Sequence, residues 1–309
     1  MRMGGVFSEG LVFSKDILPD DLDIDFMKDG YDCTSMLGAI KYNPEALEEA
    51  TLQTKKKYGP FMRLLLKIPF IKNILYPKKK SGKWPDFITH TDETRVQTLQ
   101  YVFEKYKNLP VYVTTKKDGQ SATYFCNKKE FGVCSRNLRL PRPAKIKGKY
   151  AAMKSNYWKV AEKYDIERKL KQASKDYGIN LYIQGENCGP GIQGNKYGYT
   201  ELKCFLFNIY DITHKRYFSW DEIVEFASRY GFETVPFVEK RLFDWNNTDE
   251  MVGYAKGFDP DGDKVLREGV VIRSQVPMPP DTGMANMWSL KCISPDFTEK
   301  WGNNDYSTK

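Results

Sequence analysis

The sequence predicts an α+β fold in which antiparallel sheets flank a cleft. Runs with the β-branched and aromatic composition of buried strands lie at four places, 111–113, 181–184, 203–211 and 270–274. Segments with helical spacing of apolar residues lie at three places, 157–177, 221–230 and 248–256. Because strands and helices do not alternate regularly along the chain, a doubly wound parallel sheet is not expected.

Local signals define several elements more closely. Ala122–Cys126 and Phe131–Cys134 predict a β-hairpin, since turn residues separate two strand-like runs. The helix Asp221–Tyr230 follows Ser219, a residue type that caps helix N-termini. Arg95–Tyr106 is expected to be helical as well. The longest helical segment should bury a face made up of Trp158, Ala161, Tyr164, Ile166 and Leu170.

Composition allows a substantial core. The chain has 309 residues, of which 41% are apolar, enough for one large domain and a smaller module. The formal net charge of +8 suits a polyanionic partner, but many basic proteins bind none. Charge alone therefore leaves nucleic-acid binding open.

Cysteine usage bears on the cellular compartment. The six cysteines never approach metal-knuckle spacing, and with two histidines in the chain no structural zinc site is expected. No secretory signal opens the sequence, so a reduced, intracellular protein of the cytoplasm is predicted.

The most apolar stretch covers residues 61–76. Arg63, Lys67, Pro69 and Lys72 interrupt it, and it is too short to span a bilayer, so no membrane partner is expected. A helical pair packed on the main domain is favoured over a basic amphipathic surface element that touches RNA or membrane.

The stretch Thr115–Ser121 places reactive groups at a strand end. Lys116 provides an amine, Asp118 a carboxylate, and Gly119 a tight reversal without a Cβ clash. A lysine amine becomes a nucleophile after losing its proton, which burial, neighbouring cations or a metal would promote. The alternative is a charged β-turn with solvated lysines, because Lys-Asp-Gly is good turn chemistry.

Further motifs follow in a fixed order. They are Gln184-Gly185-Glu186, Phe205-Leu206-Phe207-Asn208-Ile209-Tyr210-Asp211, Arg267-Glu268-Gly269-Val270-Val271-Ile272-Arg273 and Ser289-Leu290-Lys291. With Lys116-Lys117-Asp118-Gly119, this series resembles the ordered motifs of covalent nucleotidyltransferases, the superfamily of ATP-dependent ligases and mRNA-capping enzymes. Ser135-Arg136-Asn137 and Gly189-Pro190-Gly191-Ile192-Gln193-Gly194-Asn195 resemble the RNA ligase branch.

The resemblance covers about Pro85 to the C-terminus and implies the nucleotidyltransferase fold. It further implies an ATP-dependent RNA ligase that joins 3′-OH and 5′-phosphate RNA ends and uses ATP with Mg²⁺ or Mn²⁺.

ATP, the divalent ion and RNA are thus the cofactors and partner that the resemblance implies, and the protein is expected to act as a monomer. The reaction it implies runs through a lysyl-AMP enzyme intermediate and adenylylated RNA.

The resemblance also assigns roles to single residues. Lys116 matches the lysine that attacks the α-phosphorus of ATP, with Lys117 as the neighbouring rival. Because neighbours in an extended stretch point to opposite faces, one of the two enters the pocket. Arg136 matches an arginine that contacts AMP phosphate or the RNA end, as a guanidinium fork suits phosphate oxygens.

Two matched positions concern the nucleoside. Glu186 matches the glutamate that binds the ribose hydroxyls. Phe207 matches the aromatic residue that stacks on adenine, and Phe205, which shares its strand face, is the alternative.

Two more concern the metal and the phosphate. Glu268 matches the glutamate near the divalent ion, which prefers oxygen ligands. Lys291 matches the final motif, where a lysine touches the α-phosphate. Many relatives carry Lys-x-Lys there, whereas Ser289 precedes Lys291 here, so which family lysine Lys291 replaces stays open.

Three segments are expected in the domain organisation. Residues 1–45 resemble part of the OB barrel of one RNA ligase branch but hold too few strand-like runs to close a barrel, so a partial OB-like module or a simple hairpin appendage is predicted. Residues 46–84 are predicted to form a basic helical linker, and 85–309 the adenylation domain.

Other functions stay open at this point. A capping guanylyltransferase is disfavoured by the segment 189–194, and a DNA ligase by the short N-terminal module and the lack of a C-terminal OB region. A catalytically inactive RNA-binding relative is disfavoured because the matched site residues are all present.

Overall fold

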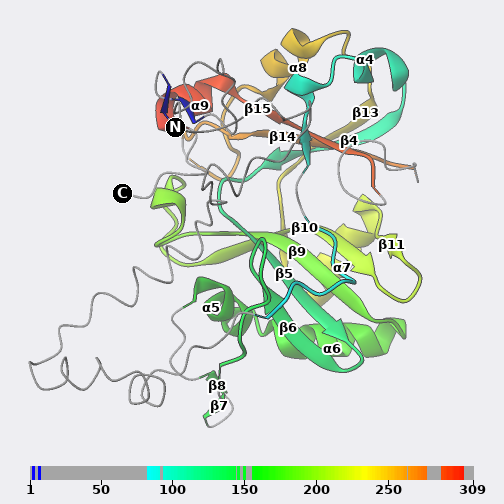
Figure 1. Cartoon of the computed structure of the whole chain (residues 1–309), viewed down its shortest axis with the longest axis vertical. Coiled ribbons are helices and arrows are strands. Elements are labelled where there is room, and N and C mark those ends of the chain that lie inside the picture. The colour runs from blue at the N-terminus through cyan, green and yellow to red at the C-terminus, as the bar shows by residue number, and fades with distance from the viewer. Residues whose placement is uncertain are drawn as a thin grey trace, which may run out of the picture. The chain divides into compact units, whose positions relative to one another are not determined.

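The computed structural model describes residues 82–90, 93–143, 155–262, 264–276 and 287–302, together with the backbone of four short strands outside these ranges. The chain divides into two compact units. One comprises 1–78 and 302–309, and the other comprises 79–301. The two large sheets and the described α-helices lie in the second unit (Figure 1).

The first sheet of this unit has six strands and is mainly antiparallel. Its members are β5 (Gln120–Asn127), β6 (Glu130–Cys134), β9 (Leu181–Cys188), β10 (Lys203–Asp211), β11 (Arg216–Tyr217) and β12 (Glu233–Thr234). The order in space is β11-β10-β9-β5-β6, and β12 adds to β10 in parallel.

The second sheet has five strands. Its members are β3 (Thr94–Arg95), β4 (Pro110–Lys116), β13 (Phe237–Leu242), β14 (Gly269–Ser274) and β15 (Ser289–Ile293). The order in space is β13-β4-β14-β15-β3, with one parallel pairing, between β15 and β3.

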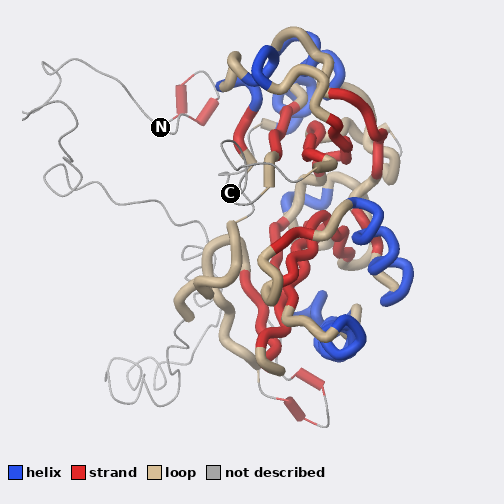
Figure 2. Tube along the Cα trace, turned by 90° about the vertical axis from the view of Figure 1, so that its right-hand side faces the viewer, coloured by secondary structure: helices blue, strands red, loops and turns tan. Residues whose placement is uncertain are grey.

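Helices cover one face of each sheet. Those of the first sheet are α5 (Asn156–Lys163), α6 (Ile166–Tyr177) and α7 (Trp220–Tyr230), and those of the second are α4 (Val102–Lys105) and α8 (Thr248–Ala255). Each group shares a buried apolar cluster with its sheet. Figure 2 shows the strands of the two sheets with helices at their flanks. The α+β architecture with antiparallel sheets is confirmed.

The two sheets are joined where β4 ends and β5 begins. Lys116 is the last residue of β4 in the second sheet, and Gln120 is the first residue of β5 in the first sheet. The three residues between them carry the chain from one sheet to the other. The Lys-Asp-Gly turn is therefore the crossing between the sheets.

Several predicted elements are confirmed in detail. The hairpin forms as β5 and β6, with Cys126 paired to Phe131. Ser219 caps α7 in a reciprocal capping box with Glu222. The helix predicted for 248–256 forms as α8.

Two helix predictions need correction. The segment 157–177 is two helices rather than one, because Asp165 adopts a left-handed backbone conformation with φ 52° and breaks it. Tyr164 beside the break is partly buried, while its four predicted companions are buried. Arg95–Tyr106 is not a single helix either, since Arg95 belongs to β3 and a short 3₁₀ turn precedes α4.

The N-terminal predictions fall outside the described residues. Of residues 1–45, the structure gives β1 (Arg2–Met3) and β2 (Val6–Phe7), an antiparallel pair. The rest of the OB-like module, the linker up to residue 81 and the apolar stretch 61–76 lie outside the described part, so those predictions stay predictions.

Two further observations concern membrane-spanning helices and cysteines. Among the described residues, no helix is long and apolar enough to cross a membrane. The five cysteines in the described part are buried free thiols, namely Cys126, Cys134, Cys188, Cys204 and Cys292.

Candidate active site

Lys116 and Glu268 meet at the crossing between the sheets. Lys116 ends β4, and its register partner on β14 is Gly269, the residue after Glu268. Lys116 Nζ donates a hydrogen bond to Glu268 Oε1 at 2.6 Å. The side chains are 23% and 10% exposed, so the pair is sheltered but reachable from solvent. A primary amine and a carboxylate are thus held together at an accessible point.

Gly119 lets the crossing pack closely against β9. A Cβ at Gly119 would lie 2.9 Å from Glu186 Cγ and 2.9 Å from Cys188 Sγ, and nearer still to the Asn187 carbonyl oxygen. Such approaches are closer than real Cβ contacts, so glycine is required by space rather than by backbone angle. The Lys-Asp-Gly turn and Glu186 are therefore neighbours.

Glu186 carries a half-buried carboxyl group. It lies on β9 opposite Ser121 of β5. Burial raises its pKa well above the ordinary value of 4.5, the nearby Lys116 ammonium lowers it, and the Glu268 carboxylate raises it further. A half-buried carboxyl group next to the amine is suited to bind ligand hydroxyl groups.

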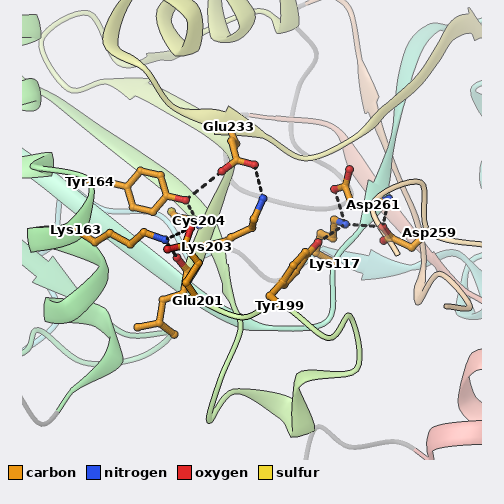
Figure 3. A network of polar contacts seen from close by, with 11 residues as sticks. Lys117, Lys163, Tyr164, Tyr199, Glu201, Lys203, Cys204, Glu233, Asp259 and Asp261 are labelled. Atoms are coloured by element: carbon orange, nitrogen blue, oxygen red, sulfur yellow. Dashed lines mark hydrogen bonds and ion pairs between the residues drawn. The ribbon is translucent and has the colours of Figure 1, made fainter. Parts of the chain in front are cut away.

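Lys117 follows Lys116 directly, and its side chain is fully buried beside Asp259, Asp261 and Tyr199 (Figure 3). Its ammonium lies 2.6 Å from Asp259 Oδ1 and 2.8 Å from Asp261 Oδ2. It also donates to the Tyr199 hydroxyl at 3.3 Å. The two neighbouring lysines therefore have different carboxylate partners.

Asp118 is held by the segment that follows β9. Its carboxylate forms an ion pair with Lys196, and its backbone N–H donates to the Tyr197 hydroxyl at 2.7 Å. Lys196 in turn lies 5.1 Å from the ring centroid of Phe297 in α9 (Pro295–Trp301). Asp118 thus links the crossing to the segment after β9 and, through Lys196, to α9.

The aromatic candidates occupy different surroundings. The pairing of β10 with β9 shifts register between Leu206 and Asn208, so Phe207 is the extra residue of a bulge. Its ring centroid lies 5.5 Å from the Arg273 guanidinium, a group of the opposite sheet. Phe205 instead lies 4.8 Å from the Lys117 ammonium. Phe207 therefore lies between the two sheets, whereas Phe205 is one of the residues around Lys117.

Arg273 is itself buried. It is 1% exposed and donates to Glu93 Oε1 at 2.7 Å. Its Nε and Nη1 atoms have no hydrogen-bond partner among the described residues. Glu93 and Arg273 lie 180 residues apart and no sequence signal links them, so this pair was missed by sequence reasoning.

The pairing of the strands shows where the other two candidate site residues, Lys291 and Arg136, lie. Lys291 lies on β15 opposite Val271 of β14, and Val271 lies opposite Thr114 of β4. Lys291 therefore shares a sheet face with Thr114 and, two residues further along β4, with Lys116. Arg136 follows β6, whose Cys134 pairs with Thr123 near the start of β5, so the chain leaves β6 toward the end that carries the crossing.

A divalent ion would find oxygen ligands at this site. Among the described residues, no group of three or more His, Cys, Asp or Glu side chains could hold a metal by itself. Mg²⁺ usually takes one or two carboxylates and completes its shell with waters and substrate phosphates. The Glu268 carboxylate fits that arrangement, with the phosphates of a nucleotide as further ligands.

Sequence reasoning missed the partners that hold the crossing in place. Lys196, Asp259 and Asp261 come from loops that lie far away in sequence, and Asp259-Pro260-Asp261-Gly262 has the composition of an ordinary turn. No local signal distinguishes such a turn from one that binds a buried lysine.

The fold and site define a protein of the nucleotidyltransferase class. The model of the RNA ligase family matches residues 109–291, which is more than half of the chain. The chain belongs to the RNA ligase family. A search of curated proteins finds no match.

Solved structures agree with this assignment. The chain is similar to a Naegleria gruberi RNA ligase with PPi, at 27% identity and a TM-score of 0.59, over 71% of this chain and 59% of that chain. A mutant of the same ligase with ATP and Mn gives the same values. A mutant with AMP and Mn gives 27% identity and a TM-score of 0.58, over 71% of this chain and 60% of that chain. The match thus spans about three fifths of the Naegleria chain.

Proposed function

We propose that this protein is an ATP-dependent RNA ligase that joins 3′-OH and 5′-phosphate RNA ends through lysyl-AMP on Lys116. The observation that carries the proposal is the Lys116 amine held 2.6 Å from the Glu268 carboxylate at the crossing between the sheets. Membership of the RNA ligase family supports the reaction class. The Naegleria ligase structures with ATP or AMP and Mn support the nucleotide and a divalent metal.

In the first step, Lys116 Nζ attacks the α-phosphorus of ATP. An N–P bond forms, the P–O bond to the β-phosphate breaks, and pyrophosphate leaves. Glu268 would hold a divalent ion here, and the ion would supply positive charge that offsets the charge of the phosphates. Lys291, which shares the sheet face with Lys116, is the proposed contact for the α-phosphate.

The nucleoside is proposed to bind between the sheets. Glu186 accepts hydrogen bonds from the ribose hydroxyls, and Phe207 stacks on adenine. Their positions support these roles, because Glu186 packs against the crossing and Phe207 lies beside a residue of the opposite sheet. Arg136 is proposed to contact the AMP phosphate or the RNA end.

Two transfers complete the reaction. The 5′-phosphate of RNA attacks the AMP phosphorus, the N–P bond breaks, and Lys116 is released. The 3′-OH then attacks the activated 5′-phosphate, a phosphodiester forms, and AMP leaves.

The test uses ATP or GTP labelled at the α-phosphate, with Mg²⁺ or Mn²⁺, followed by a denaturing gel. We expect covalent label from ATP, loss of that label when pyrophosphate is added, and sealing of nicked RNA. Label from GTP would indicate a capping-type enzyme, and preferential sealing of DNA a DNA ligase. A protein that takes up no label and seals nothing would be an inactive relative.

A further inference from the structure

We propose that Lys117 is a positioning residue, which fixes residues 257–262 and 264–267 and thereby holds Glu268 against Lys116. The inference rests on the proposed function in that Lys116 is taken as the nucleophile. Lys117 touches no substrate in this proposal. Its effect is exerted through the backbone that carries Glu268.

The ammonium group of Lys117 lies beside Tyr199, Asp259 and Asp261 (Figure 3). Its side chain and that of Asp259 are both 0% exposed. The ammonium lies 4.7 Å from the ring centroid of Tyr197 and 4.8 Å from that of Phe205. Aromatic rings and carboxylates thus both contact the buried ammonium, and both kinds of contact favour keeping it in place.

Asp259 and Asp261 belong to a loop with its own internal bonds. The N–H of Asp259 donates to the Val265 carbonyl at 2.7 Å, and that of Gly262 to the Asp259 carbonyl at 3.2 Å. The N–H of Arg267 donates to the Gly257 carbonyl at 3.0 Å. Because the loop is tied internally, fixing Asp259 also fixes the residues that lead to Glu268.

Two adjacent lysines therefore link the same two segments. Lys116 reaches Glu268, and Lys117, the next residue, reaches Asp259 and Asp261. The β14–β4 ladder already pairs Gly269 with Lys116, and the Lys117 links add a second hold on the loop that precedes Glu268. The more exposed pair, Lys116 with Glu268, can separate when a nucleotide enters, while the buried pair keeps the backbone in place.

The test variant is the double change Lys117→Met with Asp259→Asn. Lys117→Met alone leaves the Asp259 carboxylate buried without its counter-charge and is expected to destabilise the protein. The double variant removes both charges with little change in volume. An effect on Lys116 in this variant therefore comes from lost positioning and not from an unpaired buried charge. The matched control is Lys240→Met with Asp221→Asn, which removes an exposed ion pair between β13 and α7.

The first readout does not depend on ligase activity. Acylation of lysines by an amine-reactive reagent is followed by mass spectrometry, with Lys83, whose side chain is 86% exposed, as the internal standard. Without the anchor, Lys116 should acylate about threefold faster or more, because its pair with Glu268 opens more often. The control variant should acylate Lys116 at the parental rate.

The second readout is the single-turnover rate of lysyl-AMP formation. In the double variant this rate should fall by about tenfold to a hundredfold, since a misplacement of about 1 Å can cost that much. The KM for ATP should change much less, because Glu186 and Phe207 lie on the other sheet. If Lys117 had a purely structural role, the double variant would have a lower melting temperature, but the rate of lysyl-AMP formation would not fall more than the KM for ATP changes.

The outcomes distinguish the two proposals. A double variant that folds, acylates Lys116 and forms lysyl-AMP at parental rates overturns the positioning role. If the parent forms no lysyl-AMP, the proposed function fails, and the acylation rate still decides the role of Lys117. If the double variant does not fold, Asp261→Asn, which removes a carboxylate that is 39% exposed, should show the same changes at smaller size, and parental behaviour there would refute the proposal.

Discussion

Lys116 and Lys117 are neighbours in sequence, carry the same functional group and pair with carboxylates at the same distance, yet their surroundings differ. The Lys116–Glu268 pair is partly exposed, whereas Lys117 and Asp259 are completely buried. A charge that is buried and paired stays where it is, because separation would leave an unpaired charge out of water. A sheltered pair at the surface of a site can exchange its partner for a ligand. Burial therefore separates the proposed reactive lysine from the proposed anchor.

The largest effect is expected from changing the two lysines to arginine. Lys116→Arg should reduce covalent labelling by roughly a thousandfold or more, to background, because a guanidinium stays protonated and is a poor nucleophile. Lys117→Arg should keep most of the labelling, because the charge toward Asp259 and Asp261 is retained. Labelling with ATP on a denaturing gel measures both. Location of AMP on Lys117 by mass spectrometry would reverse the assignment.

The next largest effects concern the groups on the Lys116 side. Glu268→Ala and Lys291→Ala should each slow lysyl-AMP formation by about a hundredfold, the size typical of losing one charge-stabilising group. Single-turnover labelling with ATP measures the loss. Glu239→Ala, on β13, is the control and should label like the parent. Parental rates in the two test variants would remove both residues from the site.

Gly119→Ala tests the close packing of the crossing on Glu186. The added methyl group meets atoms at 2.9 Å, so we expect about 1–3 kcal/mol of destabilisation and a raised KM for ATP. Gly253→Ala in α8 is the matched control, because nothing lies within 4 Å of its added Cβ. That change should stabilise the protein by up to about 1 kcal/mol. Thermal unfolding and ATP-dependent labelling give both numbers, and an unaffected Gly119→Ala protein would contradict the packing argument.

The smallest effect is a pH dependence of stability. Burial raises the pKa of Glu186, so the folded protein holds this proton more tightly than the unfolded chain does. The stability contributed by protonation is present at low pH and is lost as pH rises through the raised pKa. Glu186→Gln should therefore unfold a few degrees higher than the parent at pH 8, on the scale of about 2–4 °C per kcal/mol, with the difference shrinking toward pH 4.

Although Glu186→Gln should be more stable than the parent at pH 8, it should bind ATP more weakly. An amide accepts fewer hydrogen bonds than a carboxylate, so Glu186→Gln should raise the KM for ATP. Glu225→Gln, an exposed position on α7, is the control for both measurements. A Glu186→Gln protein whose melting temperature follows the parent at every pH would show that the carboxyl group is not desolvated.

The sequence allowed much of the fold to be predicted where signals are local. Strand β10 has the predicted bounds 203–211, and Ser219 caps α7 as expected. Prediction failed where tertiary pairing overrides propensity. Arg95 pairs with Lys291 as a strand residue, although its neighbourhood has helical spacing.

The sequence by itself determined the order of the motifs, and through it the family and the proposed site residues. Alternation in an extended stretch also predicted different surroundings for Lys116 and Lys117. Only the tertiary structure decided what lies on each side, because the Asp259 that pairs with Lys117 comes from 142 residues further along the chain. Burial is a property of the assembled sheets and loops, and it is burial that makes one lysine an anchor and leaves the other accessible.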